Sequence, residues 1–322
     1  MTPKAILVPV GRLFSGTAAV SQAAALAHWH DADLHVVHVR TGRARLPRPV
    51  EGSTGDSVGR QPLSSMESVD TDGLRLSTAS LQGDAVIAIT HYAQTIAADL
   101  VVVGTPRRRY GLGWRPVLYA KAVARSLACP TLVVPDFATR AATRPFTNIL
   151  CPTDFSPASE GALRQAMRLA QQSGCTLRLL HVIEGFPYDT IYSGGSARRV
   201  MREHRALVDG IQQRMHAAVP QDVFDACRVE TSVVTGVPHR AILAAASEFD
   251  ADLIVMGLPK RRGVARLTTA STATPVLRRA TSPVLLEPAP AAEMARVVVT
   301  APQPGMAFSD RTFGATSGSV QL

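Results

Sequence analysis

The sequence predicts an α/β fold: two tandem, doubly wound parallel sheets of five strands each, with helices on both faces. Short apolar runs alternate along the chain with amphipathic segments of helical spacing, a pattern typical of parallel sheets covered by helices. The whole pattern then occurs a second time, so the 322 residues divide into two similar copies.

The internal repeat is visible in two stretches of each copy. KAILVPVGR near the start matches TNILCPTDF in the middle, with Ile6 on Ile149. Later, ADLVVVGTPRRR matches ADLIVMGLPKRR, with Gly104 on Gly257. The offset grows from 143 to 153 residues between these stretches, so ten extra residues enter the second copy after its second strand.

These matches set the expected domains. Copy one is expected over 1–137 and copy two over 146–288, joined by the short polar linker FATRAATRP. The remaining segment, 289–322, is poor in large apolar residues apart from RVVVT, and we expect it to be a mobile tail.

Each element of copy two follows from a local pattern. Strands are expected at 149–153, 176–183, 228–236, 252–257 and 283–288, and helices at 156–174, 194–219, 238–249 and 269–280. In the first helix Ser156 suits the N-cap, Pro157 the first turn and Gly174 the stop. Pro275 shortens or restarts the last helix.

Copy one differs from copy two in one segment. Residues 41–73, rich in Gly, Pro, Ser and Asp, occupy the place of the second helix and lack helical periodicity. We expect this segment to be mostly loop. One sheet face of copy one is then poorly covered, unless the other copy, the tail or a partner lies on it.

Composition narrows the function classes. The net charge of +9 favours an anionic partner or, alternatively, a solvated basic surface. Aromatic residues are 5%, too few for a single-strand stacking platform. No membrane-spanning run or signal peptide is expected. The four cysteines lack a CxxC motif, which argues against a zinc site or a disulfide framework and for a reducing cytoplasm.

Basic clusters stand at matching places in the two copies. They consist of Arg107, Arg108 and Arg109 in copy one, and of Lys260, Arg261 and Arg262 in copy two. One interpretation is an anion or nucleic-acid contact surface, and the other is an exposed loop with solvated charges. No helix-turn-helix or zinc-finger pattern is present, so sequence-specific binding of nucleic acid is not expected.

The sequence gives little support for catalysis. It contains no G-x-S-x-G elbow, Walker loop or G-x-G-x-x-G after a strand. Cys151 lies within the end of the first strand of copy two, next to the expected site, and is either a modifiable thiol or a buried inert one. His38 and His181 recur between the copies, which indicates a packing or hydrogen-bonding role. No catalytic residue and no metal ligand is assigned.

The stretches ILCPTDFSPASEGALRQAMRLA and DLIVMG, followed by a basic loop, a helix and SPVLLEP, resemble the universal stress protein family in its tandem two-domain form. The resemblance covers nearly all of residues 4–288. It implies an adenine-nucleotide-binding type of α/β fold and a cytoplasmic role in stress tolerance. It also implies a regulator without an established turnover reaction.

The resemblance also implies a nucleotide site, because some members of the family bind ATP through a loop of the form G-x-x-G, nine residues, G-[S/T]. Glycines there let main-chain N–H groups approach phosphates. Copy two has Gly257, Lys260, Ala270 and Ser271 at these positions. Its acidic Asp154 matches the residue that faces the ribose and adenine. The expected site comprises Pro152, Thr153, Asp154, Val182, Gly257, Lys260, Ala270 and Ser271.

Copy one has lost almost all of these features. Gly104 remains, but Arg107, Val117, Leu118 and Gly11 replace the other key residues. ATP or another adenine nucleotide, with magnesium, is therefore expected in copy two alone.

We expect an internal pseudo-dimer in which PTLVVP and PVLLEP pair along their edges. The sequence leaves open a homodimer of the chain and an unidentified protein partner. The expected function is a non-catalytic cytoplasmic stress-response protein that senses an adenine nucleotide through copy two. One alternative is a nucleotide-independent scaffold that binds a protein or anionic partner through its basic loops. The other is a slow ATP hydrolase.

Overall fold

The computed structural model describes residues 3–11, 13–14, 16–40, 69, 71–106, 115–136, 146–185, 197–259 and 272–289. Most of the first-copy segment 41–73 and the expected tail lie outside these ranges. None of the helices within them is both long and apolar enough to cross a membrane.

The described strands and helices alternate as predicted. The strands are β1 (Ala5–Val10), β2 (Asp33–Arg40), β3 (Leu76–Gln82), β4 (Leu100–Thr105), β5 (Thr131–Pro135), β6 (Asn148–Pro152), β7 (Thr176–Ile183), β8 (Arg228–Thr235), β9 (Leu253–Leu258) and β10 (Val284–Pro288). The helices are α1 (Thr17–His30), α3 (Ala85–Thr95), α4 (Arg115–Ser126), α5 (Pro157–Ser173), α7 (Ala197–Ala217), α8 (Gln221–Ala226), α9 (Pro238–Glu248) and α10 (Ala273–Arg279).

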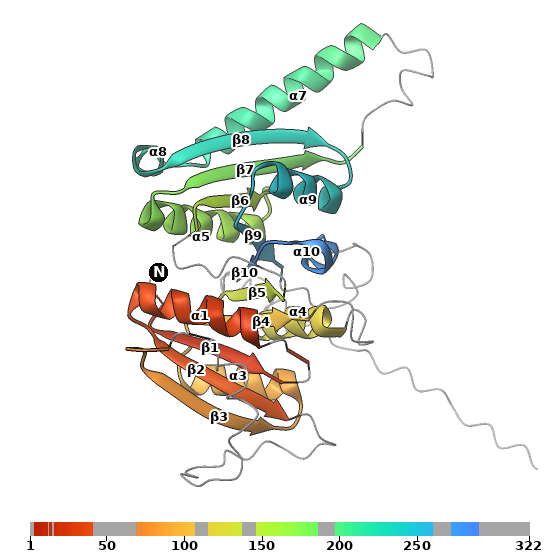
Figure 1. Cartoon of the computed structure of the whole chain (residues 1–322). Helices are drawn as coiled ribbons and strands as arrows, with labels where there is room; N and C mark the ends of the chain where they lie inside the picture. Colours follow the sequence, from red (N-terminus) through yellow and green to blue (C-terminus); the bar gives the residue numbers. More distant parts are fainter. Residues whose placement is uncertain are drawn as a thin grey trace, which may run out of the picture. The chain divides into compact units, whose positions relative to one another are not determined.

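The ten strands form one mixed sheet in the order β3-β2-β1-β4-β5-β10-β9-β6-β7-β8 (Figure 1). Within each copy all pairs are parallel, and the strand order reverses between the first and fourth strands. The pairing of β5 with β10 is antiparallel, with Leu285 opposite Leu132. The predicted pairing of these two edges is confirmed, and it makes the two five-stranded sheets continuous.

Helix α5 shows how local sequence sets an element. The Ser156 side chain accepts a hydrogen bond from the Ser159 N–H, Pro157 begins the helix, and Gly174 ends it with a left-handed φ of 60°. All three predicted signals are confirmed. Helix α8, of six residues, was not predicted, because it is too short to show periodicity.

Two apolar cores cover the two faces of the sheet, and both extend through the two copies. Helices α1, α5, α7 and α8 pack on one face, and α3, α4, α9 and α10 on the other. Alternation along a strand supplies both cores, so that Leu132 faces the first and Val133 the second. Since both cores continue past β5 and β10, the copies are joined by packing as well as by main-chain hydrogen bonds.

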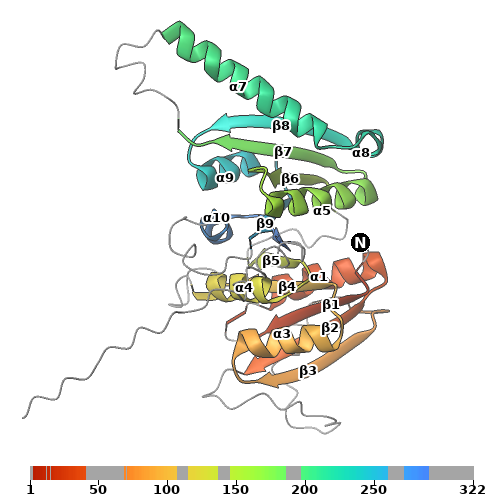
Figure 2. The ribbon, with the colours of Figure 1, turned by 180° about the vertical axis from the view of Figure 1, so that it is seen from behind.

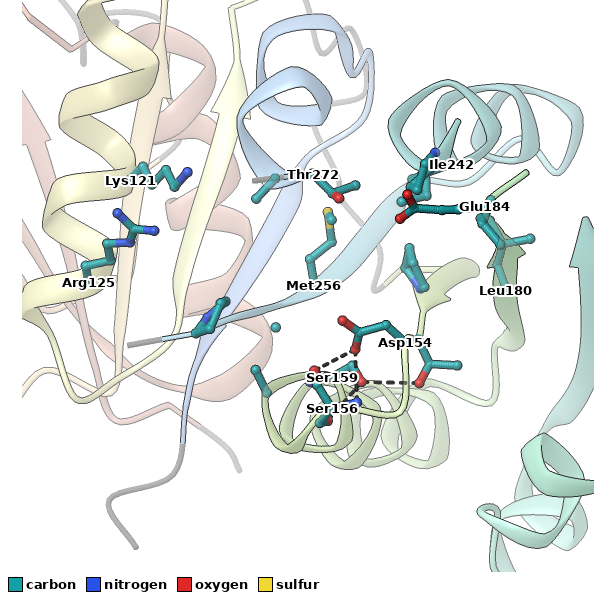
Figure 3. A pocket seen from close by; sticks show the side chains of 18 residues that line it. Lys121, Arg125, Asp154, Ser156, Ser159, Leu180, Glu184, Ile242, Met256 and Thr272 are labelled. Carbon is teal, nitrogen blue, oxygen red and sulfur yellow. Dashed lines mark hydrogen bonds between the residues drawn. The ribbon is translucent and has the colours of Figure 1, made fainter. Parts of the chain in front are cut away.

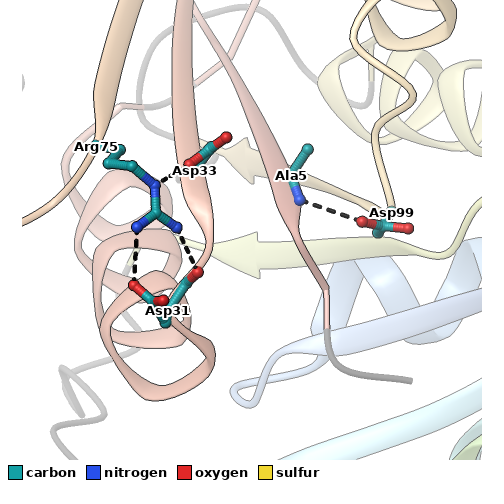
Figure 4. A network of polar contacts seen from close by, with 5 residues as sticks. All are labelled: Ala5, Asp31, Asp33, Arg75 and Asp99. Carbon is teal, nitrogen blue, oxygen red and sulfur yellow. Dashed lines mark hydrogen bonds and ion pairs between the residues drawn. The ribbon is translucent and has the colours of Figure 1, made fainter.

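Equivalent aspartates fix the start of the first strand in each copy. The Asp99 carboxylate accepts hydrogen bonds from the main-chain N–H groups of Lys4 and Ala5 (Figure 4). Asp252 does the same for Thr147 and Asn148. Figure 4 also shows an arginine, Arg75, that bridges Asp31 and Asp33 on the surface of copy one.

The two ends of the sheet differ. Helix α7 runs along β8 at one end, and β3 forms the other end (Figure 2). Residues of β3 are largely exposed, including Leu76, which is 37% exposed. The segment that takes the place of α7 in copy one falls mostly in residues 41–68, outside the described ranges.

Glu287 on β10 makes the stability of this fold depend on pH. Burial raises the pKa of its carboxyl from 4.5 to about 7, although Arg168 and Arg164 oppose the shift. A carboxyl with a raised pKa binds its proton more tightly in the folded state. Its contribution to stability is therefore full below pH 4.5 and is lost as pH rises through about 7.

We predict that Glu287→Gln removes this pH dependence. From pH 5 to pH 8 the wild type should lose roughly 2 kcal/mol more of its free energy of unfolding than the variant does, given the size of the pKa shift. Urea denaturation at both pH values measures the difference. Identical pH profiles for the two proteins would contradict the prediction.

Candidate functional site

A cavity of about 430 Å³ opens at the carboxyl ends of the copy-two strands (Figure 3). Residues at the ends of β6 and β9 line it. These strands are neighbours, and the strand order reverses between them. Ligands of open α/β sheets bind in the crevice at such a reversal. The topology alone therefore marks this cavity as the candidate site of copy two.

The cavity brings together every predicted nucleotide residue that the structure describes. Pro152, Thr153, Asp154, Val182 and Gly257 all line it. The other predicted contacts lie outside the described residues: Arg107, Arg108, Arg109, Lys260, Arg261, Arg262, Ala270 and Ser271.

Asp154 is held at the cavity wall by the N-terminus of α5. Its Oδ1 atom accepts hydrogen bonds from the Ser156 N–H at 3.0 Å and the Ser156 hydroxyl at 2.5 Å. Burial raises the pKa of the carboxyl, but hydrogen bonds from Ser156 and Ser159 outweigh burial and lower it below the usual value. Asp154 is therefore a fixed anion at neutral pH. Figure 3 shows its other oxygen pointing into the cavity.

Contacts with His181 and Arg214 hold the loop that carries Asp154 in place. The ring nitrogen Nδ1 of His181 is 2.8 Å from the main-chain oxygen of Thr153, as a hydrogen bond requires. Phe155 has a left-handed φ of 58°, stacks on the His181 ring and lies under the Arg214 guanidinium. A non-glycine residue adopts this φ only where its surroundings hold it. The bonding role expected of His181 is confirmed.

Gly257 has a packing role that the sequence did not reveal. A Cβ at this position would overlap with the Ala158 carbonyl group and lie 2.8 Å from the Ser159 nitrogen. The first turn of α5 therefore rests directly on β9 at Gly257. The glycine is required by contact between helix and strand, independently of any phosphate.

The backbone of copy one disfavours an acid at the position equivalent to Asp154. Gly11 stands there with a φ of 144°, and a Cβ would lie 2.8 Å from the Val39 carbonyl oxygen. A side chain would be strained in this conformation. At this position copy one therefore differs from copy two in its backbone conformation as well as in its side chain.

The structure adds polar and charged lining residues that the site prediction missed: Lys121, Arg125, Ser156, Ser159, Glu184 and Thr272. Ser156 was recognised only as a helix cap. Lys121 and Arg125 belong to α4 of copy one, so they reach this cavity across the boundary between copies. The predicted edge pairing could have indicated these two residues, because it places the last helices of the two copies opposite each other.

The charges of the cavity wall are segregated. Lys121 and Arg125 lie on one side, and Asp154 and Glu184 on the other (Figure 3).

Nearby Cys151 is fully buried, and burial raises the pKa of its thiol to about 12. Such a thiol is un-ionised at neutral pH, which favours the inert interpretation of Cys151.

The fold and this cavity define a class: a tandem α/β protein with a pocket at the strand reversal of one copy. The model of the universal stress protein family matches residues 3–135 and again 145–288. The chain belongs to the universal stress protein family, and carries two tandem domains of it.

Curated relatives support the assignment. The chain is 30% identical over 143 residues to universal stress protein G of Salmonella typhimurium, covering 44% of this chain and 98% of that protein. It is 26% identical over 148 residues to a universal stress protein of Methanocaldococcus jannaschii, covering 46% and 85%. Each relative therefore matches a segment about as long as one copy.

Solved structures reproduce the two-domain fold. A universal stress protein from Archaeoglobus fulgidus has a TM-score of 0.53 at 19% identity, covering 88% of this chain and 95% of that one. A putative universal stress protein from Pseudomonas aeruginosa gives 0.52 at 17% identity, covering 89% and 93%. At these identities the likeness concerns the fold alone.

The contact at Gly257 yields a prediction. Gly257→Ala should lower the free energy of unfolding by about 1–3 kcal/mol, because the new methyl group meets main-chain atoms of α5 that cannot move independently of the helix. Urea denaturation of wild type and variant measures the loss.

Gly210→Ala is the matched control. Gly210 lies within α7 and has nothing within 4 Å of an added Cβ, so alanine there should stabilise the protein by about 0.5–1 kcal/mol. A gain of stability in both variants would contradict the close packing of α5 against Gly257.

Proposed function

We propose that the chain is a non-catalytic stress-response protein that binds an adenine nucleotide in the cavity of copy two. The observation that carries this proposal is the fixed Asp154 carboxylate at the strand reversal of the sheet. A volume of about 430 Å³ lies within the range of roughly 300–1,000 Å³ usual for small-molecule sites.

The walls suit the parts of a nucleoside. An ionised Asp154 accepts hydrogen bonds from neutral donors, such as ribose hydroxyls, without a change of its protonation state. Val182, Pro238 and Ile242 supply apolar lining to the cavity, against which a planar base can be buried. The site residues proposed within the described part of the chain are Pro152, Thr153, Asp154, Val182 and Gly257.

The environment of Asp154 favours binding over hydrolysis. A general base works best with a pKa near the operating pH. The pKa of Asp154 is lowered and its Oδ1 atom is occupied by Ser156, which makes it a weak base for water. We therefore propose that nucleotide is held and released unchanged, in contrast to a slow ATP hydrolase.

Ligand-induced thermal shifts test the proposal. ATP, ADP and AMP with magnesium should each raise the melting temperature of the wild type. At a ligand concentration of ~100 times the Kd, binding adds about 2.7 kcal/mol of stability. Asp154→Ala should abolish the shift, and phosphate release from ATP should stay at the background rate.

Asp84→Ala provides the control for the loss of an acid that accepts hydrogen bonds at the N-terminus of a helix. The Asp84 carboxylate caps α3 in copy one by accepting hydrogen bonds from Val86 and Ile87. This variant should melt earlier than the wild type but keep its nucleotide-induced shift. No shift in the wild type at millimolar nucleotide would overturn the proposal, and favour the nucleotide-independent scaffold. Sustained phosphate release that Asp154→Ala removes would favour the hydrolase.

A further inference from the structure

The cavity of copy two is built from both copies. Lys121 and Arg125 on α4 belong to copy one, and every other described lining residue belongs to copy two. Helix α4 packs against α10, its counterpart in copy two. Figure 3 shows both basic side chains extending from α4 toward the cavity.

The contact between these helices lies at the pseudo-two-fold axis. The Lys121 Nζ donates a hydrogen bond of 2.6 Å to the Thr274 hydroxyl, and these residues are separated by 153 positions, the offset between the copies. A residue and its own equivalent touch only where the symmetry axis passes. By the same offset Arg125 corresponds to Arg278, which is exposed on α10 and does not line the cavity.

Duplication within one chain allows the two sides of this axis to differ. A symmetric homodimer carries the same residue on both sides, whereas here lysine faces threonine. Lys121 is 7% exposed, so its charge is screened less by solvent than that of a surface lysine. Arg125 adds a planar guanidinium that can hold two phosphate oxygens at once.

We propose that copy one supplies the cationic half of the copy-two site, where Lys121 and Arg125 hold the phosphate groups of the nucleotide. This inference rests on the proposed function, since it assigns the orientation of the same ligand. The nucleoside end lies against Asp154 and Glu184, and the phosphate chain extends toward α4. The site therefore selects phosphorylated nucleotides over the free nucleoside.

Isothermal titration of adenosine and of ATP, each with magnesium, tests the assignment on four proteins: wild type, Arg125→Ala, Lys121→Met and Arg278→Ala. The wild type should bind ATP about 100-fold more tightly than adenosine, since each of the two charge-assisted contacts is expected to contribute about 10-fold. Arg125→Ala and Lys121→Met should each reduce that ratio about 10-fold and leave adenosine affinity unchanged.

Arg278→Ala is the symmetry-matched control and should keep the wild-type ratio, since it removes the same charge from the equivalent helix. Arg125 is exposed, so its variant carries the test if Lys121→Met fails to fold. An unchanged ratio in Arg125→Ala would overturn the composite site and leave nucleotide binding intact. An equal loss in Arg278→Ala would overturn it in favour of a long-range charge effect. A wild type that binds neither ligand would instead overturn the proposed function, and this inference with it.

Discussion

The antiparallel pairing of β5 with β10 determines how the two copies face each other. It joins two edges that would otherwise present unpaired N–H and C=O groups, and it makes both apolar cores continuous through the chain. The same pairing places α4 beside α10 and so brings Lys121 onto Thr274. Without this pairing the copy-two cavity would lack its basic wall.

The two copies have diverged in ways that complement each other. Copy two has the acidic loop, held by His181 and the first turn of α5, whereas copy one has Gly11 at the equivalent position, where a side chain would be strained. In our proposal copy one contributes Lys121 and Arg125 to the remaining site. In this proposal a domain that lacks the acidic residue still takes part in binding by its neighbour.

Sequence reasoning predicted the repeat, the ten strands and the edge pairing, and it named five of the residues that line the cavity of copy two. These succeed because periodicity, helix caps and turn residues are local signals. It could not identify the packing role of Gly257, since that depends on how closely α5 approaches β9. It also missed Lys121, because a contact across the pseudo-symmetry axis is set by the docking of two helices far apart in the chain.

The number of nucleotides bound per chain tests this account most directly. A calorimetric titration of the wild type with ATP should give one site for each chain of two domains, because Gly11 stands in copy one where copy two has Asp154, and because Lys121 and Arg125 of α4 line the cavity of copy two. Two sites per chain would contradict the account, since copy one would then bind nucleotide despite the backbone conformation of Gly11.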